Sequence, residues 1–185
     1  MRKNIGSKAL IYPQPVLILA TWSEDGTPDA MNAAWGGVSG TDEVTLCIGS
    51  HKTTENFLAR GAFTISMGVA AQTAACDYVG LVSAQKVPDK FARAGFHAVK
   101  SECVDAPLIR ELPLALECRV ESYNRETHCL IGKVLGVSVD EEFLDAEGKP
   151  DLDKMQIITF DPCGRTYRVI GKIAGNAYED GKKLF

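Results

Sequence analysis

The apolar run Val16-Leu-Ile-Leu-Ala-Thr21 is followed by the polar segment Ser23-Glu-Asp-Gly-Thr-Pro28. An Asp-Gly pair between apolar segments is a strong hairpin signal, because a type I′ turn needs positive φ at both of its central residues. A second strand is expected near Ala30–Val38, and the turn Gly40-Thr-Asp42 leads to a third strand at Val44–Gly49. This stretch predicts a three-stranded antiparallel meander.

Two longer strands are expected in the second half of the chain. Apolar and polar residues alternate along Leu114–Tyr123, which predicts a strand with one solvated face and places Glu117 on that face. Cys129–Val139 returns alongside it and contains Gly132 and Gly136, where a bulge or a barrel bend is expected.

The remaining elements are short. Helices are expected at Thr53–Arg60 before Gly61, at Ala70–Leu81 and at Asp89–Ala94, and further strands at Ala62–Met67, Met155–Phe160 and Tyr167–Ile170. No Gly-x-Gly-x-x-Gly segment follows a strand, so a dinucleotide-binding doubly wound sheet is not favoured. The pattern predicts a mainly β fold, a closed or split β-barrel with short covering helices.

Composition limits the function classes. The 185 residues, 45% of them hydrophobic, are enough for one core, so residues 1–185 are expected to form a single domain. The net charge of −4 argues against a nucleic-acid partner. The run Val16–Ala20 is too short for a membrane span, and no signal peptide is evident. The six cysteines include no Cys-x-x-Cys pair, so we expect no metal site, and free thiols in a reducing cytoplasm.

Two segments carry residues suited to a flat, phosphorylated ligand. Asn32 offers both a donor and an acceptor, small Ala33 and Ala34 would let a ring approach the backbone, and Trp35 could stack on it. Ser50, Lys52, Thr53 and Thr54 lie where a helix is expected to begin, and both its N–H groups and its dipole favour an anion. Each group also has a structural interpretation: a threonine that only caps the helix, a solvated Lys52, and a buried indole at Trp35.

The order of the motifs resembles the flavin reductase-like, FMN-binding split-barrel family, and within it the flavoredoxin-like branch. The resemblance lies in Pro15–Thr21, Asp25-Gly26, Met31-Asn-Ala-Ala-Trp35, Ser50-His-Lys-Thr-Thr54 with Asn56, Phe63–Ser66, Asp77–Ser83, Asp89-Lys-Phe91 and His128–Val134. It implies that FMN is contacted by Asn32, Ala33, Ala34, Trp35, Ser50, Lys52, Thr53 and Thr54, with His51 and Asn56 as second choices. It also implies a homodimer with the flavin near the subunit interface, where Asp89, Lys90 or Tyr167 would reach it. His128 either lies near the redox face or is an ordinary strand histidine.

The resemblance implies an FMN-dependent oxidoreductase that takes electrons from NAD(P)H or a redox protein and passes them to flavin, iron or another protein. No catalytic side chain is assigned, because the cofactor itself carries the electronic change. A flavoredoxin-type electron carrier without small-molecule turnover is the alternative. A barrel that has lost the flavin and only binds small molecules is a third interpretation.

Overall fold

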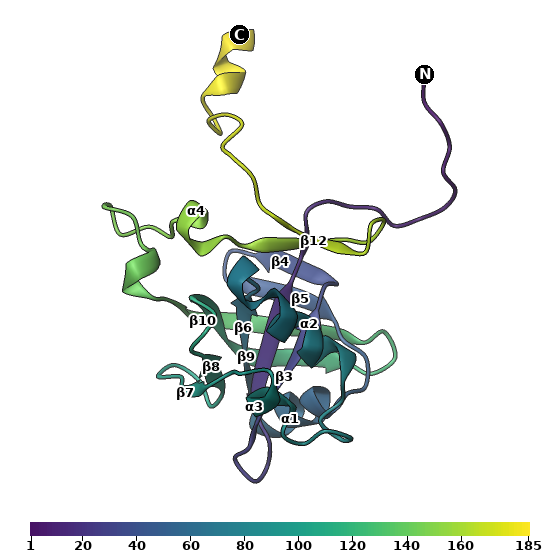
Figure 1. The fold of residues 1–185 in the computed structure, drawn as a ribbon, viewed down its shortest axis with the longest axis vertical. Helices are drawn as coiled ribbons and strands as arrows, with labels where there is room; N and C mark the ends of the chain where they lie inside the picture. The colour runs from purple at the N-terminus through teal and green to yellow at the C-terminus, as the bar shows by residue number, and fades with distance from the viewer.

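A curled antiparallel sheet forms the body of the molecule (Figure 1), in a computed structural model that describes residues 1–185. Its seven strands lie in the order β3-β2-β6-β9-β10-β5-β4. Their bounds are β2 Leu17–Trp22, β3 Pro28–Ala33, β4 Gly36–Gly40, β5 Glu43–Cys47, β6 Ala62–Met67, β9 Leu114–Asn124 and β10 Cys129–Val139. The mainly β split-barrel prediction is confirmed.

Smaller elements complete the fold. A three-stranded sheet joins β1 (Gln14–Pro15), β11 (Ile158–Asp161) and β12 (Thr166–Val169), and β7 (Ala98–Lys100) pairs with β8 (Pro107–Ile109). The helices are α1 Lys52–Arg60, α2 Thr73–Leu81, α3 Lys90–Arg93 and α4 Leu152–Met155, with 3₁₀ turns at Ala70–Gln72, Glu141–Phe143 and Asp180–Leu184. None of the helices combines the length and apolar character needed to cross a bilayer.

The predicted three-stranded meander is wrong. β2 and β3 do form a hairpin, with Thr21 opposite Asp29, but β4 and β5 lie at the other edge of the sheet. Because the sheet curls, only Ala34 and Trp35 are needed to carry the chain from one edge to the other. The Trp35 carbonyl then accepts a hydrogen bond of 2.7 Å from the Cys47 N–H. Glycine is required at the start of β4, since a Cβ on Gly36 would lie 2.5 Å from the Thr45 carbonyl oxygen.

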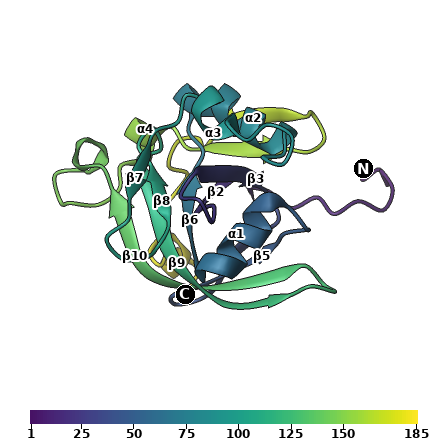
Figure 2. The same ribbon diagram turned by 90° about the horizontal axis from the view of Figure 1, so that it is seen from below.

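Strand β2 is buried on both faces and joins two core clusters. Leu17 and Leu19 point into the barrel, where they pack in one cluster with Phe57 of α1. Ile18 and Ala20 point outward, into a second cluster with residues of α2 and α3. Figure 2 shows the same arrangement, with α1 in the opening of the curled sheet and α2 and α3 outside it. The expectation that α2 and α3 cover the sheet is confirmed.

Several predicted boundaries hold and others shift: the strand expected near Ala30–Val38 is two strands, β3 and β4, and the strand expected at Tyr167–Ile170 is Thr166–Val169. Helix α1 ends at Gly61, whose φ of 67° is the left-handed conformation expected of a glycine after a helix. The bulges expected at the glycines of β10 coincide with register shifts at Ile131/Gly132 and Val134/Gly136. The strand expected to begin at Met155 begins at Ile158 instead, because Met155 ends α4 and Gln156 turns with φ 53°.

Glu117 is buried, which corrects the prediction of a solvated position. Its side chain lies on β9 under the segment that joins β7 to β8, and the residue is only 4% exposed. The hydroxyls of Ser101 and Ser138 both donate to its carboxylate. Burial alone would raise the pKa of Glu117, but these hydrogen bonds outweigh it and the pKa is lowered.

Candidate functional site

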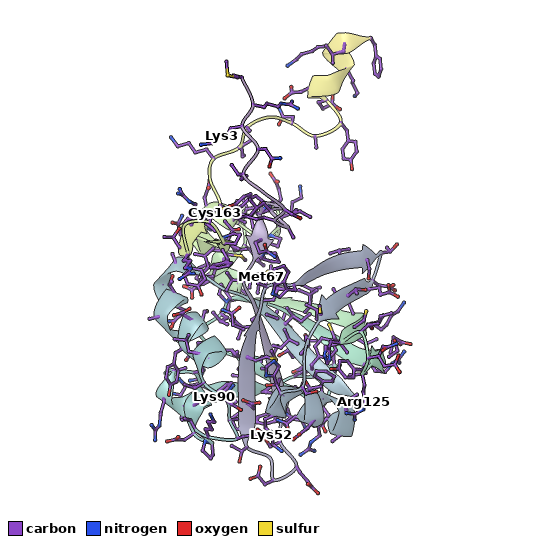
Figure 3. All side chains as sticks on the ribbon, turned by 90° about the vertical axis from the view of Figure 1, so that its right-hand side faces the viewer. Lys3, Lys52, Met67, Lys90, Arg125 and Cys163 are labelled. Atoms are coloured by element: carbon purple, nitrogen blue, oxygen red, sulfur yellow. The ribbon has the colours of Figure 1, made fainter.

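A cavity of about 280 Å³ opens between β3, the beginning of α1 and the segment that follows α2. Its lining residues are Met31, Asn32, His51, Lys52, Thr53, Val79, Gly80, Leu81, Val82, Ser83, Ala84 and Lys90. Figure 3 shows Lys52 and Lys90 at the same end of the molecule, opposite the end that carries Lys3 and Cys163. We call this space the β3–α1 cavity.

The first turn of α1 is held by Thr54. Its hydroxyl donates to the Gly49 carbonyl at 2.7 Å and accepts from the His51 N–H at 3.3 Å. The first N–H with a helical acceptor belongs to Glu55, which donates to the His51 carbonyl at 3.2 Å. The N–H groups of the three residues before it therefore lie at the positive end of the helix dipole. This end of α1 can receive an anion.

Lys52 adds a cation at the same place. Its side chain is 35% exposed, and its Nζ lies 3.8 Å from the Glu55 carboxylate. That contact is a weak surface ion pair, so most of the donor capacity of the ammonium group faces the cavity and solvent. With the helix N–H groups, Lys52 provides the donor set that a phosphate monoester requires.

A buried ion pair between Asp29 and Lys90 lies beside the β3–α1 cavity, and Lys90 is one of the lining residues. Asp29 and Lys90 have side chains 2% and 4% exposed, with 3.3 Å between Asp29 Oδ1 and Lys90 Nζ. The Thr53 hydroxyl donates to Asp29 Oδ2 at 2.7 Å. Lys90 Nζ also donates to the carbonyls of Val79 and Val82, at 3.3 and 3.2 Å. This network ties β3, α1, α2 and α3 together around the site.

Asn32 lies on the β3 wall and is oriented by α2. Its Nδ2 donates to the Cys76 carbonyl at 3.1 Å. Gly80 permits this close packing, because a Cβ there would lie 3.0 Å from the Asn32 Cβ. The nearby Tyr167 hydroxyl donates to Asp77 at 2.7 Å. Burial and this bond raise the pKa of Tyr167, so the phenol stays protonated at neutral pH.

The structure brings together five of the residues predicted from the sequence. Asn32, His51, Lys52, Thr53 and Lys90 all line the β3–α1 cavity. Ser50 directly precedes His51 in the chain and is exposed.

The other predicted residues lie elsewhere. Ala33 packs in the barrel core, and Asn56 is 3% exposed and donates to the Ser23 hydroxyl at 3.2 Å. Ala34 and Trp35 line a different cavity, together with Cys47. Trp35 is 59% exposed, so the interpretation of an ordinary buried indole is wrong.

Asp89, His128 and Asp29 complete the comparison with the sequence. Asp89 is exposed and pairs with Arg93 at 2.8 Å. His128 Nδ1 lies 3.4 Å from the Tyr123 hydroxyl, away from the β3–α1 cavity lining. The sequence-based prediction assigned no role to Asp29. Asp29 beside Ala30 and Met31 near the start of a strand was a usable signal, because a buried carboxylate needs a partner.

Comparison with known proteins identifies the fold family. The family model of the flavin reductase like domain matches residues 9–152. The chain belongs to the flavin reductase-like family. The family model is that of a flavin reductase like domain, which supports a flavin cofactor for the chain.

Two flavoredoxins are similar to this family member along nearly its whole length. The flavoredoxin of Desulfovibrio vulgaris (Miyazaki F) is 34% identical with a TM-score of 0.92, covering 98% of this chain and 100% of that chain. The flavoredoxin from Methanosarcina acetivorans is 28% identical with a TM-score of 0.88, covering 100% of both chains. The FMN-binding protein from Thermus thermophilus, with bound 1-cyclohex-2-enone, shares the fold at 18% identity and a TM-score of 0.74, over 95% of this chain and 99% of that chain.

The β3–α1 cavity fits a phosphorylated flavin by its donor chemistry. At one end of the cavity, the N-terminus of α1 and Lys52 can bind an anion. The amide of Asn32 lies on the β3 wall, away from that end. Gly80 lets α2 pack closely against Asn32, because a Cβ there would lie 3.0 Å from the Asn32 Cβ. Polar groups at both ends of a cleft are what orient a flat, phosphorylated ligand.

Proposed function

We propose that this protein binds FMN in the β3–α1 cavity and acts as an FMN-dependent oxidoreductase. The observation that carries the proposal is that the N-terminus of α1, Lys52 and Asn32 line one cavity. The similarity to flavoredoxins supports it, because it extends over nearly the whole chain.

The phosphate would be held at the first turn of α1. There the backbone N–H groups, the Lys52 ammonium and the Ser50 hydroxyl are the donors, with His51 beside them, whereas the Thr53 hydroxyl already donates to Asp29. Thr54 and Asn56 contribute indirectly, because their polar atoms are already engaged in holding the loop and the helix. Lys90 likewise positions Asp29 and Thr53, since its ammonium group has three partners within the chain.

The ring would extend from the first turn of α1 along β3. Asn32 would meet its polar edge, whereas Ala33 packs in the barrel core and Ala34 lines a different cavity. Trp35 borders a different cavity just beyond the end of this strand, and we propose that a second molecule could enter there. Bound FMN would supply the chemistry, by accepting electrons from one molecule and releasing them to another.

The proposed electron donor is NAD(P)H or a redox protein, and the acceptor is flavin, iron or another protein. The residues of the chain bind and orient the reactants, and no acid–base dyad is required of them. A second function, electron carriage without small-molecule turnover, is favoured by the 34% identity with the Desulfovibrio flavoredoxin.

A binding titration tests the cofactor assignment. Purified protein freed of any bound flavin is titrated with FMN, with riboflavin and with FAD, and flavin fluorescence is followed. We expect FMN to bind with one equivalent per chain and riboflavin, which lacks the phosphate, to bind at least about tenfold more weakly. Equal affinities for FMN and riboflavin would remove the phosphate site at α1, and failure to bind any of the three would remove the proposed function.

Anaerobic reduction separates the two functions. The FMN-loaded protein is mixed with NADH or NADPH, and the flavin absorbance is followed in a stopped-flow instrument. Loss of flavin absorbance after mixing with NADH or NADPH, within the time of one catalytic turnover, supports a nicotinamide-dependent oxidoreductase. Bleaching only with a reduced redox protein supports an electron carrier.

We also propose that the protein is a homodimer that uses the free edge of the sheet. Strand β4 has a sheet partner on one side only. Val38 on β4 and Leu135 and Val137 on β10 are exposed and border one groove. Exposed apolar side chains beside an unpaired strand edge are typical of an interaction surface.

A further inference from the structure

Two cysteines face each other across neighbouring strands. Cys47 is the last residue of β5 and Cys129 the first residue of β10, and they are directly opposite in the antiparallel register. The Ile48 N–H donates to the His128 carbonyl at 2.8 Å, and the Cys47 N–H points the other way, to Trp35 on the β4 side. The two cysteines therefore form a non-hydrogen-bonded pair of the ladder.

This position brings the thiols within bonding reach. In non-hydrogen-bonded antiparallel pairs the Cα atoms lie about 4.5 Å apart, and the two side chains project from the same face. A disulfide requires a Cα separation of roughly 4.4–6.8 Å. Leu46 and Leu130, the neighbours in the two strands, point into the barrel core. Cys47 and Cys129 therefore both project from the outer face of the sheet.

Exposure together with an opposite cysteine distinguishes this pair from the other thiols, including exposed Cys103, which lies in no strand. Cys47 is exposed and Cys129 half-buried, so a small reagent reaches them. Cys76 and Cys118 are fully buried, and burial raises their pKa values to about 11 and about 12, which makes them poor nucleophiles. Cys163 is exposed but lies in a turn with no cysteine opposite.

We propose that Cys47 and Cys129 are a redox-active dithiol that low-molecular-weight disulfides convert reversibly into a cross-strand disulfide. One cysteine thiolate attacks a sulfur of the small disulfide, forming a mixed disulfide and releasing one small thiol. The opposite cysteine thiolate then attacks the protein sulfur of the mixed disulfide and releases the second small thiol. The protein loses two electrons and two protons, and the small disulfide gains both.

The bond would tether the loop that leads to α1. Cys47 is followed by Ile48 and Gly49, and the Ile48 carbonyl accepts a hydrogen bond of 2.7 Å from Tyr123 on β9. Closing the bond would add a covalent link to β10 beside the existing hydrogen bonds of Ile48 to His128 and Tyr123. We expect slower amide hydrogen exchange in residues 48–52 of the oxidised protein. The inference goes beyond the proposed flavin function and does not depend on it.

Oxidised glutathione is the probe for the test. Reduced full-length protein is treated with it, free thiols are alkylated, and the peptides are mapped by mass spectrometry without reduction. We expect one cross-linked peptide pair, which contains Cys47 and Cys129 from the same polypeptide. The cross-link should disappear after dithiothreitol treatment.

Single variants complete the test. Cys47→Ser and Cys129→Ser should each leave the remaining cysteine as a glutathione adduct, because no resolving thiol is present. Cys163→Ser is the matched control, with its thiol at the opposite end of the molecule from Lys52 (Figure 3), and should form the cross-link normally. Alkylation of both Cys47 and Cys129 after oxidation, stable glutathione adducts on these two cysteines in the unsubstituted protein, or a Cys47–Cys129 link between two polypeptides would each overturn the proposal.

Discussion

Lys52 and Lys90 line the same cavity but differ in burial and in the number of their partners within the chain. Lys90 is almost fully buried, with Asp29 and two backbone carbonyls as partners. Lys52 has only a long contact with Glu55. A ligand therefore finds a cation available at Lys52, whereas Lys90 is already committed to the fold.

Replacing Lys52 by Ala should weaken FMN binding without unfolding the protein. A hydrogen bond to a charged group is worth about 1.5–3 kcal/mol, which corresponds to a loss of roughly tenfold to a hundredfold in affinity. Fluorescence titration of FMN measures the loss, and Lys149→Ala, at an exposed lysine in a loop, is the control. An unchanged affinity in Lys52→Ala would show that this ammonium group does not contact the phosphate.

Replacing Lys90 by Met should destabilise the protein strongly. Removing one partner of a buried ion pair leaves the other charge uncompensated, which costs about 3–5 kcal/mol of unfolding free energy. The double variant Asp29→Asn with Lys90→Met should lose less than the sum of the single losses, because the two residues interact directly. Urea denaturation measures both, with exposed Lys86→Met as control; additive losses would show that the pair is not coupled.

At the scale of elements, Glu117 links the β7–β8 hairpin to the barrel. It lies on β9, and its carboxylate accepts hydrogen bonds from Ser138 on β10 and from Ser101, which follows β7. The lowered pKa of Glu117 means that the unfolded chain binds its proton more readily than the native protein does. The stabilisation from Glu117 is therefore complete above the ordinary value of 4.5 and is lost as the pH falls below it.

A pH series on Glu117→Gln tests this linkage. At pH 7 the variant should be less stable than the unsubstituted protein by about 1–3 kcal/mol, because it lacks a charged acceptor for two buried hydroxyls. The difference should shrink as the pH is lowered through and below 4.5. Urea unfolding at several pH values measures it, with exposed Glu121→Gln as control. A difference that stays constant with pH would contradict the role of the charge.

Sequence patterns predicted the elements better than their arrangement. Alternation found β9, and the glycines of β10 located its bulges, because these signals are local. The position of β4 could not be predicted, because strand adjacency depends on how far the sheet curls. Glu117 is buried because the β7–β8 hairpin passes over β9. The alternation of residues within β9 alone gives no information about that hairpin.

The candidate site was predictable to the same extent. Hydroxyl residues and a lysine at the start of a largely polar helix predicted the anion-receiving end of α1. The far wall of the cavity, from Val79 to Ala84, comes from a segment that the residue patterns alone did not connect with β3. The family resemblance pointed to that segment, and the ion pair of Asp29 with Lys90 explains why it lies there.

At the scale of the whole molecule, we expect a dimer formed through the groove between β4 and β10. Val38→Asp and Val137→Asp each place a charge among exposed apolar residues, so each should shift the protein towards the monomer. Analytical ultracentrifugation measures the shift. The control is Val99→Asp on β7, a less exposed apolar position on another hairpin. A dimer unaffected by both variants would move the interface elsewhere.

The crossing at Ala34–Trp35 also sets the order in which the chain can fold. The hairpins β2–β3, β4–β5 and β9–β10 each pair strands that are adjacent in sequence, so each closes a short loop. The pairing of β5 with β10 instead joins residues 43–47 to residues 129–133. Because distant pairings form slowly, we expect the hairpins to form early and the seam between β5 and β10 to close last. Ala34 and Trp35 thus connect the β2–β3 hairpin to the β4–β5 hairpin. We expect both hairpins to form before β6, β9 and β10 pair between them.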